Sequence, residues 1–282
     1  MIIGVVGTGS MGSGIAQVAA QSGNQVKAYD LVPEMAGKAL EKIKALTQKN
    51  VEKGKMTAEA RDLLLANLQM VDSMSGFADA DFVIEAVVED PAVKKKVFSE
   101  LAQICKPSTI LGTNTSSISI TSISAAVKNP DKVVGMHFFN PPQVMKLVEI
   151  TRGYYTSDET VEATINLAES FGKKTVLVKR DSPGFIVNRL MFAQFAEAIR
   201  LVQEGVASME DVDEAMRLGL NHPMGPFQLQ DFTGVEVCLS VMEYLYTEMR
   251  QPQFATPELM KNIVRAGRYG RKTNAGWYDY SK

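Results

Sequence analysis

The sequence predicts an α/β domain built on a parallel sheet, followed by an all-α domain. Two observations support this prediction. Short runs of apolar and β-branched residues alternate with helical patterns as far as Thr175–Val178, and this alternation is typical of parallel strands joined by crossover helices. After Lys179-Arg-Asp the strand patterns stop, and only helical patterns follow. We therefore expect one domain at residues 1–181 and a second at residues 182–282.

Composition and charge restrict the class of protein. With 45% hydrophobic and 22% charged residues, the chain of 282 residues has the composition of a globular protein that can bury a core. Its net charge is −2, and acidic and basic residues are interleaved. Nucleic acid is therefore not expected as a partner, because phosphate neutralisation needs a concentrated basic face. Cys105 and Cys238 lie far apart without CxxC spacing, so we expect neither a disulfide framework nor a metal site.

We expect a cytoplasmic protein without a membrane partner. Met1 is followed at once by a strand pattern, which leaves no room for a signal peptide. No uninterrupted apolar run reaches the ~18–20 residues needed to span a bilayer. The two widely spaced cysteines fit buried thiols in a reducing compartment.

A glycine motif follows the first strand pattern. Ile2-Ile-Gly-Val-Val runs directly into Gly7-Thr-Gly9-Ser-Met-Gly12 and then into a helical pattern. Gly7 allows a tight turn, Gly9 lets a pyrophosphate approach the backbone, and Gly12 lets the helix pack on the strand. The N-terminus of the helix offers free N–H groups and a partial positive charge to phosphates. The motif predicts a dinucleotide site in a Rossmann-type domain rather than a plain glycine-rich turn.

An acidic residue supports this prediction and bears on the choice of cofactor. The second strand pattern, Gln25-Val-Lys-Ala-Tyr, ends at Asp30, about 20 residues further on, where a carboxylate accepts the hydroxyls of the adenosine ribose. A carboxylate repels a 2′-phosphate, and no Arg follows in Leu31-Val-Pro-Glu, so NAD is favoured over NADP. NADP stays the weaker alternative, because a neighbouring loop could bring in a cation.

A helix pair is inserted after Asp30. One helical pattern runs from Pro33 to about Lys53 and a second follows Thr57, which is more than a plain crossover requires. Lys49 and Lys53 are four residues apart and share one face. Their spacing fits either a solvated charged face or a site for an anionic group of a substrate.

Small polar residues and a histidine follow later strand patterns. Ser116 comes directly after the pattern that ends at Gly112, at the edge where ligands bind in open α/β sheets, although it could also belong to a polar loop that caps a helix. The apolar run Val133–Met136 leads to His137, and Glu149 lies twelve residues further on in a second apolar run. A carboxylate can fix the tautomer and orientation of an imidazole. These residues alone fit either an acid–base pair or a histidine that caps a strand.

The second half predicts a long buried helix. Ser182 as N-cap and Pro183 at the first position predict a helix over Gly184–Gln203. This helix is apolar nearly all round, which predicts burial in the domain centre or in a subunit contact, and hence at least a homodimer. Asn188 is unusual there, because a buried amide without partners costs about 1–3 kcal/mol. Its side chain therefore either takes part in a structural hydrogen-bond network or forms a hydrogen bond with a substrate. Further helices are expected at Met209–Leu218, Phe227–Arg250 and Pro257–Ala266.

Taken together, these motifs resemble those of the short-chain L-3-hydroxyacyl-CoA dehydrogenases, and most of all the bacterial 3-hydroxybutyryl-CoA group of that family. The resemblance covers the whole chain and depends on a set of motifs in a fixed order: Gly7-Thr-Gly-Ser-Met-Gly-Ser-Gly-Ile-Ala, Val83-Ile-Glu-Ala, Asn114-Thr-Ser-Ser, Met136-His-Phe-Phe-Asn-Pro, Ser182-Pro-Gly-Phe with Asn188-Arg, Asn221-His-Pro-Met-Gly-Pro, and Trp277-Tyr-Asp-Tyr. The departures, such as Pro142-Gln-Val in place of Ala-Pro-Val, lie outside the catalytic positions.

The resemblance implies a role for each matching position. It makes His137 the catalytic base and Glu149 the acid that orients it, with Ser116 and Asn188 as polar contacts to the substrate. The remaining roles concern the cofactor and the CoA moiety: Asp30 for the adenosine ribose, Glu89, Lys94 and Asn114 for the nicotinamide half of the cofactor, and Lys49 and Lys53 for the CoA phosphates.

The activity implied by the resemblance is reversible hydride transfer between NAD and a (3S)-3-hydroxyacyl-CoA. The expected pair is 3-hydroxybutanoyl-CoA and acetoacetyl-CoA, in fatty acid or butyrate metabolism. One alternative is a β-hydroxyacid dehydrogenase acting on a free acid, but that class uses a Lys on the long helix and no Lys lies between Pro183 and Ala207. The other alternative is a non-enzymatic NAD-binding protein that kept the fold.

Overall fold

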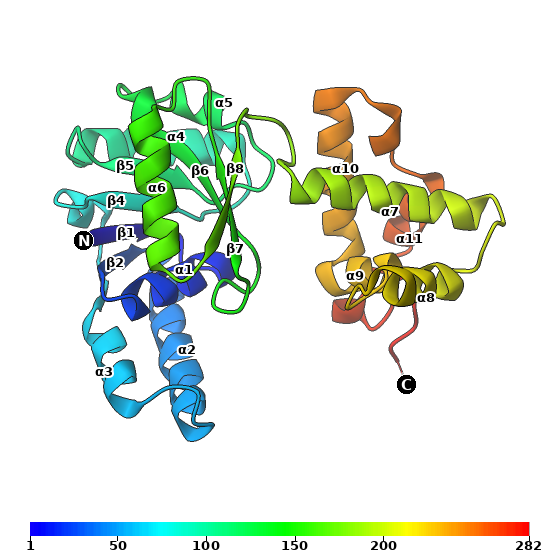
Figure 1. Cartoon of the computed structure of the whole chain (residues 1–282), viewed down its shortest axis with the longest axis horizontal. Coiled ribbons are helices and arrows are strands. Elements are labelled where there is room, and N and C mark those ends of the chain that lie inside the picture. Colours follow the sequence, from blue (N-terminus) through cyan, green and yellow to red (C-terminus); the bar gives the residue numbers. More distant parts are fainter. Residues whose placement is uncertain (282) are drawn as a thin grey trace. The chain divides into compact units, whose positions relative to one another are not determined.

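The computed structural model describes residues 1–281. The chain divides into two compact units, which we call unit 1 (Met1–Ser182) and unit 2 (Pro183–Lys282). Figure 1 shows that unit 1 contains the sheet and that unit 2 is helical.

Unit 1 is built on one eight-stranded sheet with the order β3-β2-β1-β4-β5-β6-β7-β8. All neighbouring strands are parallel except β6 and β7, which are antiparallel. The chain builds outward from β1 in one direction and then returns to place β4 on its other side, which creates the switch point where open α/β sheets bind ligands. The strands are β1 (Ile2–Val6), β2 (Gln25–Tyr29), β3 (Leu68–Met70), β4 (Phe82–Glu85), β5 (Ile110–Thr113), β6 (Val133–Phe138), β7 (Leu147–Thr151) and β8 (Lys174–Val178).

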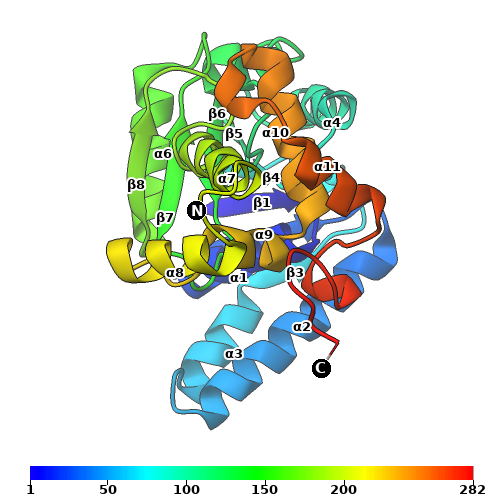
Figure 2. The same ribbon diagram turned by 90° about the vertical axis from the view of Figure 1, so that its right-hand side faces the viewer.

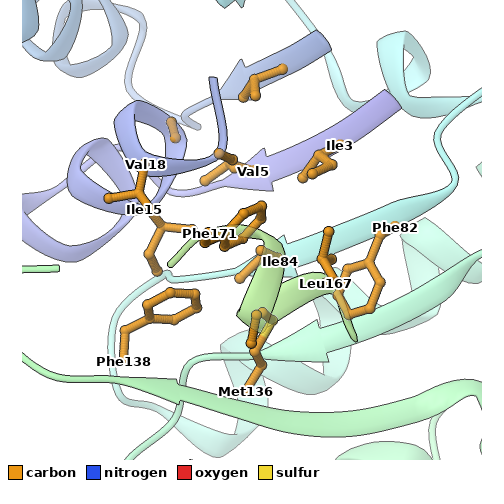
Figure 3. Close-up of a cluster of buried hydrophobic side chains, with 14 of the residues drawn as sticks. Ile3, Val5, Ile15, Val18, Phe82, Ile84, Met136, Phe138, Leu167 and Phe171 are labelled. Atoms are coloured by element: carbon orange, nitrogen blue, oxygen red, sulfur yellow. The ribbon is translucent and has the colours of Figure 1, made fainter. Parts of the chain in front are cut away.

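Helices cover both faces of this sheet, and Figure 2 shows α6 and α4 on opposite sides of it. Ile15 and Val18 of α1 and Leu167 of α6 are buried against strand residues such as Ile84 and Met136, as Figure 3 shows. Burial of these apolar side chains is the main stabilising contribution to unit 1. Its helices and 3-10 turns are α1 (Ser10–Gln21), α2 (Pro33–Glu52), α3 (Ala58–Ala66), η1 (Met74–Phe77), α4 (Pro91–Ile104), α5 (Ile120–Ser124), η2 (Pro130–Lys132) and α6 (Asp158–Ser170).

The predicted helix pair is α2 and α3, which extends away from the sheet in Figure 1. The side chain of Thr57 accepts a hydrogen bond from the Ala60 N–H and caps α3. The pair is followed by β3, a strand that the sequence pattern did not predict, since Leu-Gln-Met has no β-branched residue and only three positions.

Unit 2 contains five α-helices and two 3-10 turns within the part of the chain that the structure describes. Its core packs around Phe195, Phe227, Met242 and Trp277. None of the helices within residues 1–281 combines the length and hydropathy that crossing a bilayer requires. The elements are α7 (Val187–Gln203), α8 (Met209–Leu220), α9 (Pro226–Thr233), α10 (Val235–Met249), η3 (Pro252–Phe254), α11 (Glu258–Arg265) and η4 (Arg271–Thr273).

Two predictions about these helices are wrong. The long helix begins at Val187 rather than at Gly184, because Gly184 and Phe185 have φ values of +73° and +47°, in the left-handed region that a right-handed helix cannot include. Leu190 on this helix is 69% exposed in the single chain. The helix predicted over Phe227–Arg250 is two helices, because Gly234 breaks it with a φ of +108°.

Two buried carboxylates fasten the C-terminal tail to unit 2. Asp231 accepts hydrogen bonds from the Trp277 N–H, the Tyr278 N–H and the Tyr280 hydroxyl. Asp213 accepts bonds from the Phe227 N–H at the start of α9 and from the Tyr278 hydroxyl. Burial raises the pKa of Asp213 above its ordinary value. The tail is therefore an integral part of the helical unit.

Candidate active site

The glycine loop forms a cradle at the end of β1. A Cβ on Gly7, whose φ is +89°, would lie 2.6 Å from the Ala86 carbonyl oxygen, and a Cβ on Gly12 would lie 1.8 Å from the Gly7 oxygen. A Cβ on Gly9 would meet nothing within 4 Å, so the space beside it is open. Gly9 is also the N-cap of α1, whose first N–H groups therefore face this space. The loop can accommodate a pyrophosphate, because Gly9 leaves space beside its backbone and the first N–H groups of α1 can donate hydrogen bonds to phosphate oxygens.

Asp30 is held rigidly beside this loop. Its Oδ2 accepts hydrogen bonds from the Thr8 N–H at 2.7 Å and the Thr8 hydroxyl at 2.9 Å, and its Oδ1 accepts one from the Val32 N–H at 3.0 Å. It lines a cavity of about 680 Å³ together with Gly7 and Gly9. The lining of that cavity also includes the apolar side chains of Val88, Val93 and Val97. This combination of an acid, a phosphate cradle and an apolar slot fits an adenine dinucleotide.

The ends of four strands lie in one row along the same edge of the sheet. Backbone pairing places Val6 beside Glu85, Glu85 beside Thr113, and Thr113 beside Gly135. The glycine loop, the loop after β4 and the loop with Ser116 therefore follow one another along this edge. His137 lies on β6 two positions beyond Gly135, at the far end of the row.

A buried ionic network joins the second and third of these loops. Glu85 is 0% exposed, and its oxygens accept hydrogen bonds from the Val87 N–H, the Lys94 ammonium and the Thr113 hydroxyl, each at 2.7 Å. Lys94 is 1% exposed and also lies 3.3 Å from Glu89. The Glu85 oxygens thus accept hydrogen bonds from three donors, one of which is an ammonium group.

Glu89 organises the loop that carries Ser116. Its Oε1 accepts hydrogen bonds from the Thr115 hydroxyl at 2.5 Å, the Ser116 N–H at 3.0 Å and the Ser117 hydroxyl at 3.2 Å. Burial acts to raise the pKa of Glu89, but the charge of Lys94 and these hydrogen bonds outweigh it and hold the pKa below its ordinary value. Glu89 is therefore ionised at neutral pH and fixes the Ser116 backbone.

The antiparallel pairing of β6 with β7 brings His137 directly opposite Glu149. The imidazole Nδ1 lies 2.8 Å from Glu149 Oε2, and Glu149 is 0% exposed. The Phe139 ring lies 4.6 Å from the imidazole, measured between ring centroids. Because Nδ1 is bonded to Glu149, proton exchange with a ligand would use Nε2.

Asn114 ties this pair to the Ser116 loop. Its side-chain oxygen accepts a hydrogen bond from the Phe138 N–H at 2.9 Å, directly after His137. The structure thus brings together Glu89, Lys94, Asn114, Ser116 and His137 along one edge of one sheet. The arrangement can exchange a proton with a ligand at the far end of a dinucleotide site.

Family comparison identifies the fold that carries this site. The family description "3-hydroxyacyl-CoA dehydrogenase, NAD binding domain" matches residues 2–182, and "3-hydroxyacyl-CoA dehydrogenase, C-terminal domain" matches residues 184–280. The chain belongs to the 3-hydroxyacyl-CoA dehydrogenase family. The resemblance inferred from the motifs, the succession of a Rossmann-type and a helical domain, and NAD as cofactor are confirmed.

Individual relatives agree with this assignment over their full lengths. The chain is 45% identical to a probable 3-hydroxybutyryl-CoA dehydrogenase of Bacillus subtilis, covering 99% of this chain and 96% of the relative. It is 44% identical to the 3-hydroxybutyryl-CoA dehydrogenase of Clostridioides difficile, covering all of both chains. The crystal structure of (S)-3-hydroxybutyryl-CoA dehydrogenase from Ralstonia eutropha matches with a TM-score of 0.96 and 40% identity, over 100% of this chain and 99% of that one.

The other predicted residues of this 3-hydroxyacyl-CoA dehydrogenase lie apart from the sheet edge. Lys49 and Lys53 are exposed at the end of α2, and within residues 1–281 neither forms an ion pair. Asn188 is half-buried in the first turn of α7, so it belongs to unit 2 whereas the other predicted residues belong to unit 1. Their roles stay predictions.

Three residues that hold the site together were not singled out from the sequence: Thr8, which bonds Asp30, and Glu85 and Thr113 of the buried ionic network. A signal for Glu85 was present, because a charged residue ended the otherwise apolar run Phe82-Val-Ile-Glu. A charge at the end of a buried strand needs partners. The partners themselves could not be predicted, since Lys94 and Thr113 reach Glu85 from a helix and from a neighbouring strand.

Neither cysteine contributes a nucleophile. Burial raises the pKa of the Cys105 thiol to about 11 and that of the Cys238 thiol to about 12, so both stay protonated at neutral pH. Among the described residues, no three His, Cys, Asp or Glu side chains come together as metal ligands could.

Proposed function

We propose that the protein interconverts (3S)-3-hydroxybutanoyl-CoA and acetoacetyl-CoA with NAD as the redox partner. The observation that carries this proposal is the buried His137–Glu149 pair at the end of the row of strand ends that begins at the glycine loop. The relatives with 3-hydroxybutyryl-CoA in their names support a four-carbon acyl chain.

In this proposal His137 carries the proton. In the oxidative direction its Nε2 accepts the proton of the substrate's 3-hydroxyl, and in the reductive direction the imidazolium returns it. Glu149 stabilises the imidazolium and holds the ring in place through Nδ1. Bound NAD supplies the hydride acceptor or donor.

Ser116 and Asn188 are proposed to contact the reacting oxygen. Donors placed where negative charge develops often contribute ~3 kcal/mol each. Ser116 suits this role, because Glu89 fixes its backbone N–H at 3.0 Å. Asn188 suits it chemically, as an amide can donate to an alkoxide.

The remaining roles follow the same family pattern. We propose that Asp30 contacts the adenosine ribose, that Glu89, Lys94 and Asn114 contact the nicotinamide half, and that Lys49 and Lys53 bind CoA phosphates.

We also propose a cytoplasmic enzyme that forms at least a homodimer. The exposed apolar side chains of Leu190 and Leu218 in unit 2 support an intersubunit contact. Light scattering of the purified protein would test the dimer, and a stable monomer would contradict it.

One assay tests the proposed function. NADH oxidation is followed with acetoacetyl-CoA and then with free acetoacetate, and each measurement is repeated with NADPH. We expect rapid oxidation with the thioester and NADH, and far slower reactions in the other three combinations. Absence of NADH oxidation with acetoacetyl-CoA would refute the proposal, and equal rates with free acetoacetate would favour the free-acid alternative.

A further inference from the structure

The network of Glu85, Lys94 and Glu89 carries a net charge of −1 from three ionic groups. Lys94 is shared by two carboxylates, at 2.7 Å from Glu85 and 3.3 Å from Glu89. Lys94 needs only one carboxylate for neutrality, so with both Glu85 and Glu89 present the network holds one carboxylate in surplus. We propose that Glu85 is a positioning residue whose charge raises the affinity of this site for the oxidised, cationic nicotinamide relative to the reduced one.

The position of the network supports this inference, which rests on the proposed function of the site. Asp30 follows β2 and the glycine loop follows β1, so the adenosine and pyrophosphate lie over those strand ends. The other half of a dinucleotide must then extend along the row toward His137. Glu85 lies between the two, since it pairs with Val6 on one side and with Thr113 on the other.

The alternative to this inference is a structural role for Glu85 as the counter-ion of Lys94, because a buried ammonium group needs a partner of opposite charge. A glutamine has the same shape, and its amide could still accept a hydrogen bond from the Val87 N–H. A fully buried carboxylate carries a desolvation cost that a neutral amide avoids. Because Glu89 also lies beside Lys94, the network has one carboxylate more than its single lysine requires, and the nicotinamide ring, which is positive in NAD⁺ and neutral in NADH, would respond to that extra charge.

The surroundings strengthen the effect of this charge. Glu85 and Lys94 are both out of contact with water, so their charges are weakly screened. No other acidic group is hydrogen-bonded to Lys94 among the described residues. The net field of the network at the strand ends is therefore that of one negative charge.

The test compares the affinities for the two forms of the cofactor in the absence of substrate. Dissociation constants for NAD⁺ and NADH are measured by isothermal titration calorimetry for the wild type and for Glu85→Gln. We expect the ratio of the NAD⁺ to the NADH dissociation constant to rise by roughly three- to ten-fold, the effect of one partly screened unit charge on another. An unchanged ratio, with both affinities equally weakened, would show a purely structural role and overturn the inference.

Two further variants keep the test decisive. Asp81→Asn is the matched control, because Asp81 also accepts hydrogen bonds from a lysine and from a backbone N–H. Asp81 precedes the amino end of β4, whereas Glu85 lies at its carboxyl end. The ratio of the two dissociation constants in Asp81→Asn should therefore equal that of the wild type. If Glu85→Gln does not fold, as shown by circular dichroism, Glu89→Gln also makes the network neutral, and it should raise the ratio in the same direction. An unchanged ratio in a folded Glu89→Gln variant would equally overturn the inference.

The result of this binding test can be distinguished from the result of the turnover assay for the proposed function. Cofactor binding is measured without any thioester, whereas the proposed function depends on turnover of acetoacetyl-CoA. A wild type that binds both nucleotides and shows the ratio change in Glu85→Gln, but does not reduce acetoacetyl-CoA, would refute only the proposed substrate. A wild type that binds neither nucleotide would refute both.

Discussion

At the scale of single residues, the proposed chemistry depends on strand register. His137 and Glu149 are twelve positions apart in sequence, and antiparallel pairing of β6 with β7 brings their side chains within 2.8 Å. A slip of one residue in that pairing would move one side chain to the opposite face of the sheet. The hydrophobic residues on either side of each, such as Met136 and Val148, are fully buried and fix the register.

Replacing His137 by glutamine should abolish most turnover. We expect kcat with acetoacetyl-CoA to fall by about 10²–10⁴-fold, because the amide cannot exchange a proton near neutral pH. NADH affinity should change little, since the glycine loop and Asp30 are untouched. His222→Gln, at the other histidine of the chain, is the matched control and should retain normal kcat. Near-normal turnover of His137→Gln would remove His137 from the mechanism.

The sequence predicted these residues only in part. It showed His137 at the end of a strand and Glu149 in an apolar run, because both facts are local. It did not show that the two strands pair antiparallel, which decides whether the side chains meet. For the same reason Glu85 escaped notice, since its partners Lys94 and Thr113 come from other elements.

At the scale of elements, the turn from β1 into α1 leaves no space for extra atoms. A Cβ on Gly12 would lie 1.8 Å from the Gly7 oxygen, which is a backbone atom and cannot move aside like a flexible side chain. The close approach of helix to strand sets where the N–H groups of α1 point. The cradle for the pyrophosphate is therefore a product of backbone packing.

Replacing Gly12 by alanine should weaken cofactor binding. The methyl group must push α1 away from the turn, and we expect the NADH dissociation constant to rise by about tenfold or more, corresponding to at least ~1.4 kcal/mol. Gly37→Ala is the matched control, because a Cβ there meets nothing within 4 Å and alanine favours the helix α2. Fluorescence titration with NADH measures both. Equal affinities in the two variants would contradict the proposed cradle.

Because Glu89 holds this loop, the free energy of unfolding should depend on pH in the acidic range. The pKa of Glu89 lies below its ordinary value of 4.5 in the folded protein, so folding favours the ionised form. The stability that this group contributes is present above about pH 4.5 and is lost as pH falls through the lowered pKa. Glu89→Gln should therefore show a smaller loss of unfolding free energy between about pH 6 and about pH 3 than the wild type.

Urea titrations at the two pH values measure this difference. Glu59→Gln is a useful comparison, because Glu59 is fully exposed on α3 although its pKa is also lowered. Water screens such a group, so that variant should follow the wild type closely. Parallel pH curves for Glu89→Gln and the wild type would contradict the role assigned to Glu89.

Most elements were predictable, and the failures have identifiable causes. The strands of the parallel sheet are short apolar runs with clear ends, so their patterns were informative. The start of α7 was not predictable, since Phe185 adopts a left-handed conformation that its residue type rarely takes. The strand β3 is stabilised by its pairing with β2 rather than by its own sequence.

At the scale of the whole molecule, each unit has its own core. The cluster in unit 1 joins the sheet to α1 and α6, and the cluster in unit 2 joins α7, α9 and α10 to Trp277. Trp277 is the only tryptophan of the chain, so its fluorescence reports on unit 2 alone. NADH binding reports on unit 1, where the glycine loop lies. The two signals allow the units to be followed separately.

Replacing Asp231 by alanine should destabilise unit 2. The change leaves the Trp277 and Tyr278 N–H groups without their acceptor, which we expect to cost about 2–3 kcal/mol of unfolding free energy. Asp279→Ala, an exposed carboxylate in the same tail, should change the unfolding free energy by less than about 0.5 kcal/mol. Urea unfolding followed by tryptophan fluorescence compares the two. Coincident curves would contradict the importance of Asp231.

The hydrogen bonds that Asp231 accepts from the tail also affect the order in which the two units can fold during synthesis. All eight strands of the sheet lie within residues 1–182, so unit 1 can fold while later residues are still leaving the ribosome. The helical unit must wait, because Asp231 lacks its three tail donors until residues 277–280 have been made. A polypeptide that stops before Trp277 would carry a buried carboxylate without these three donors and a core without Trp277, so we expect unit 2 to be unstable in it.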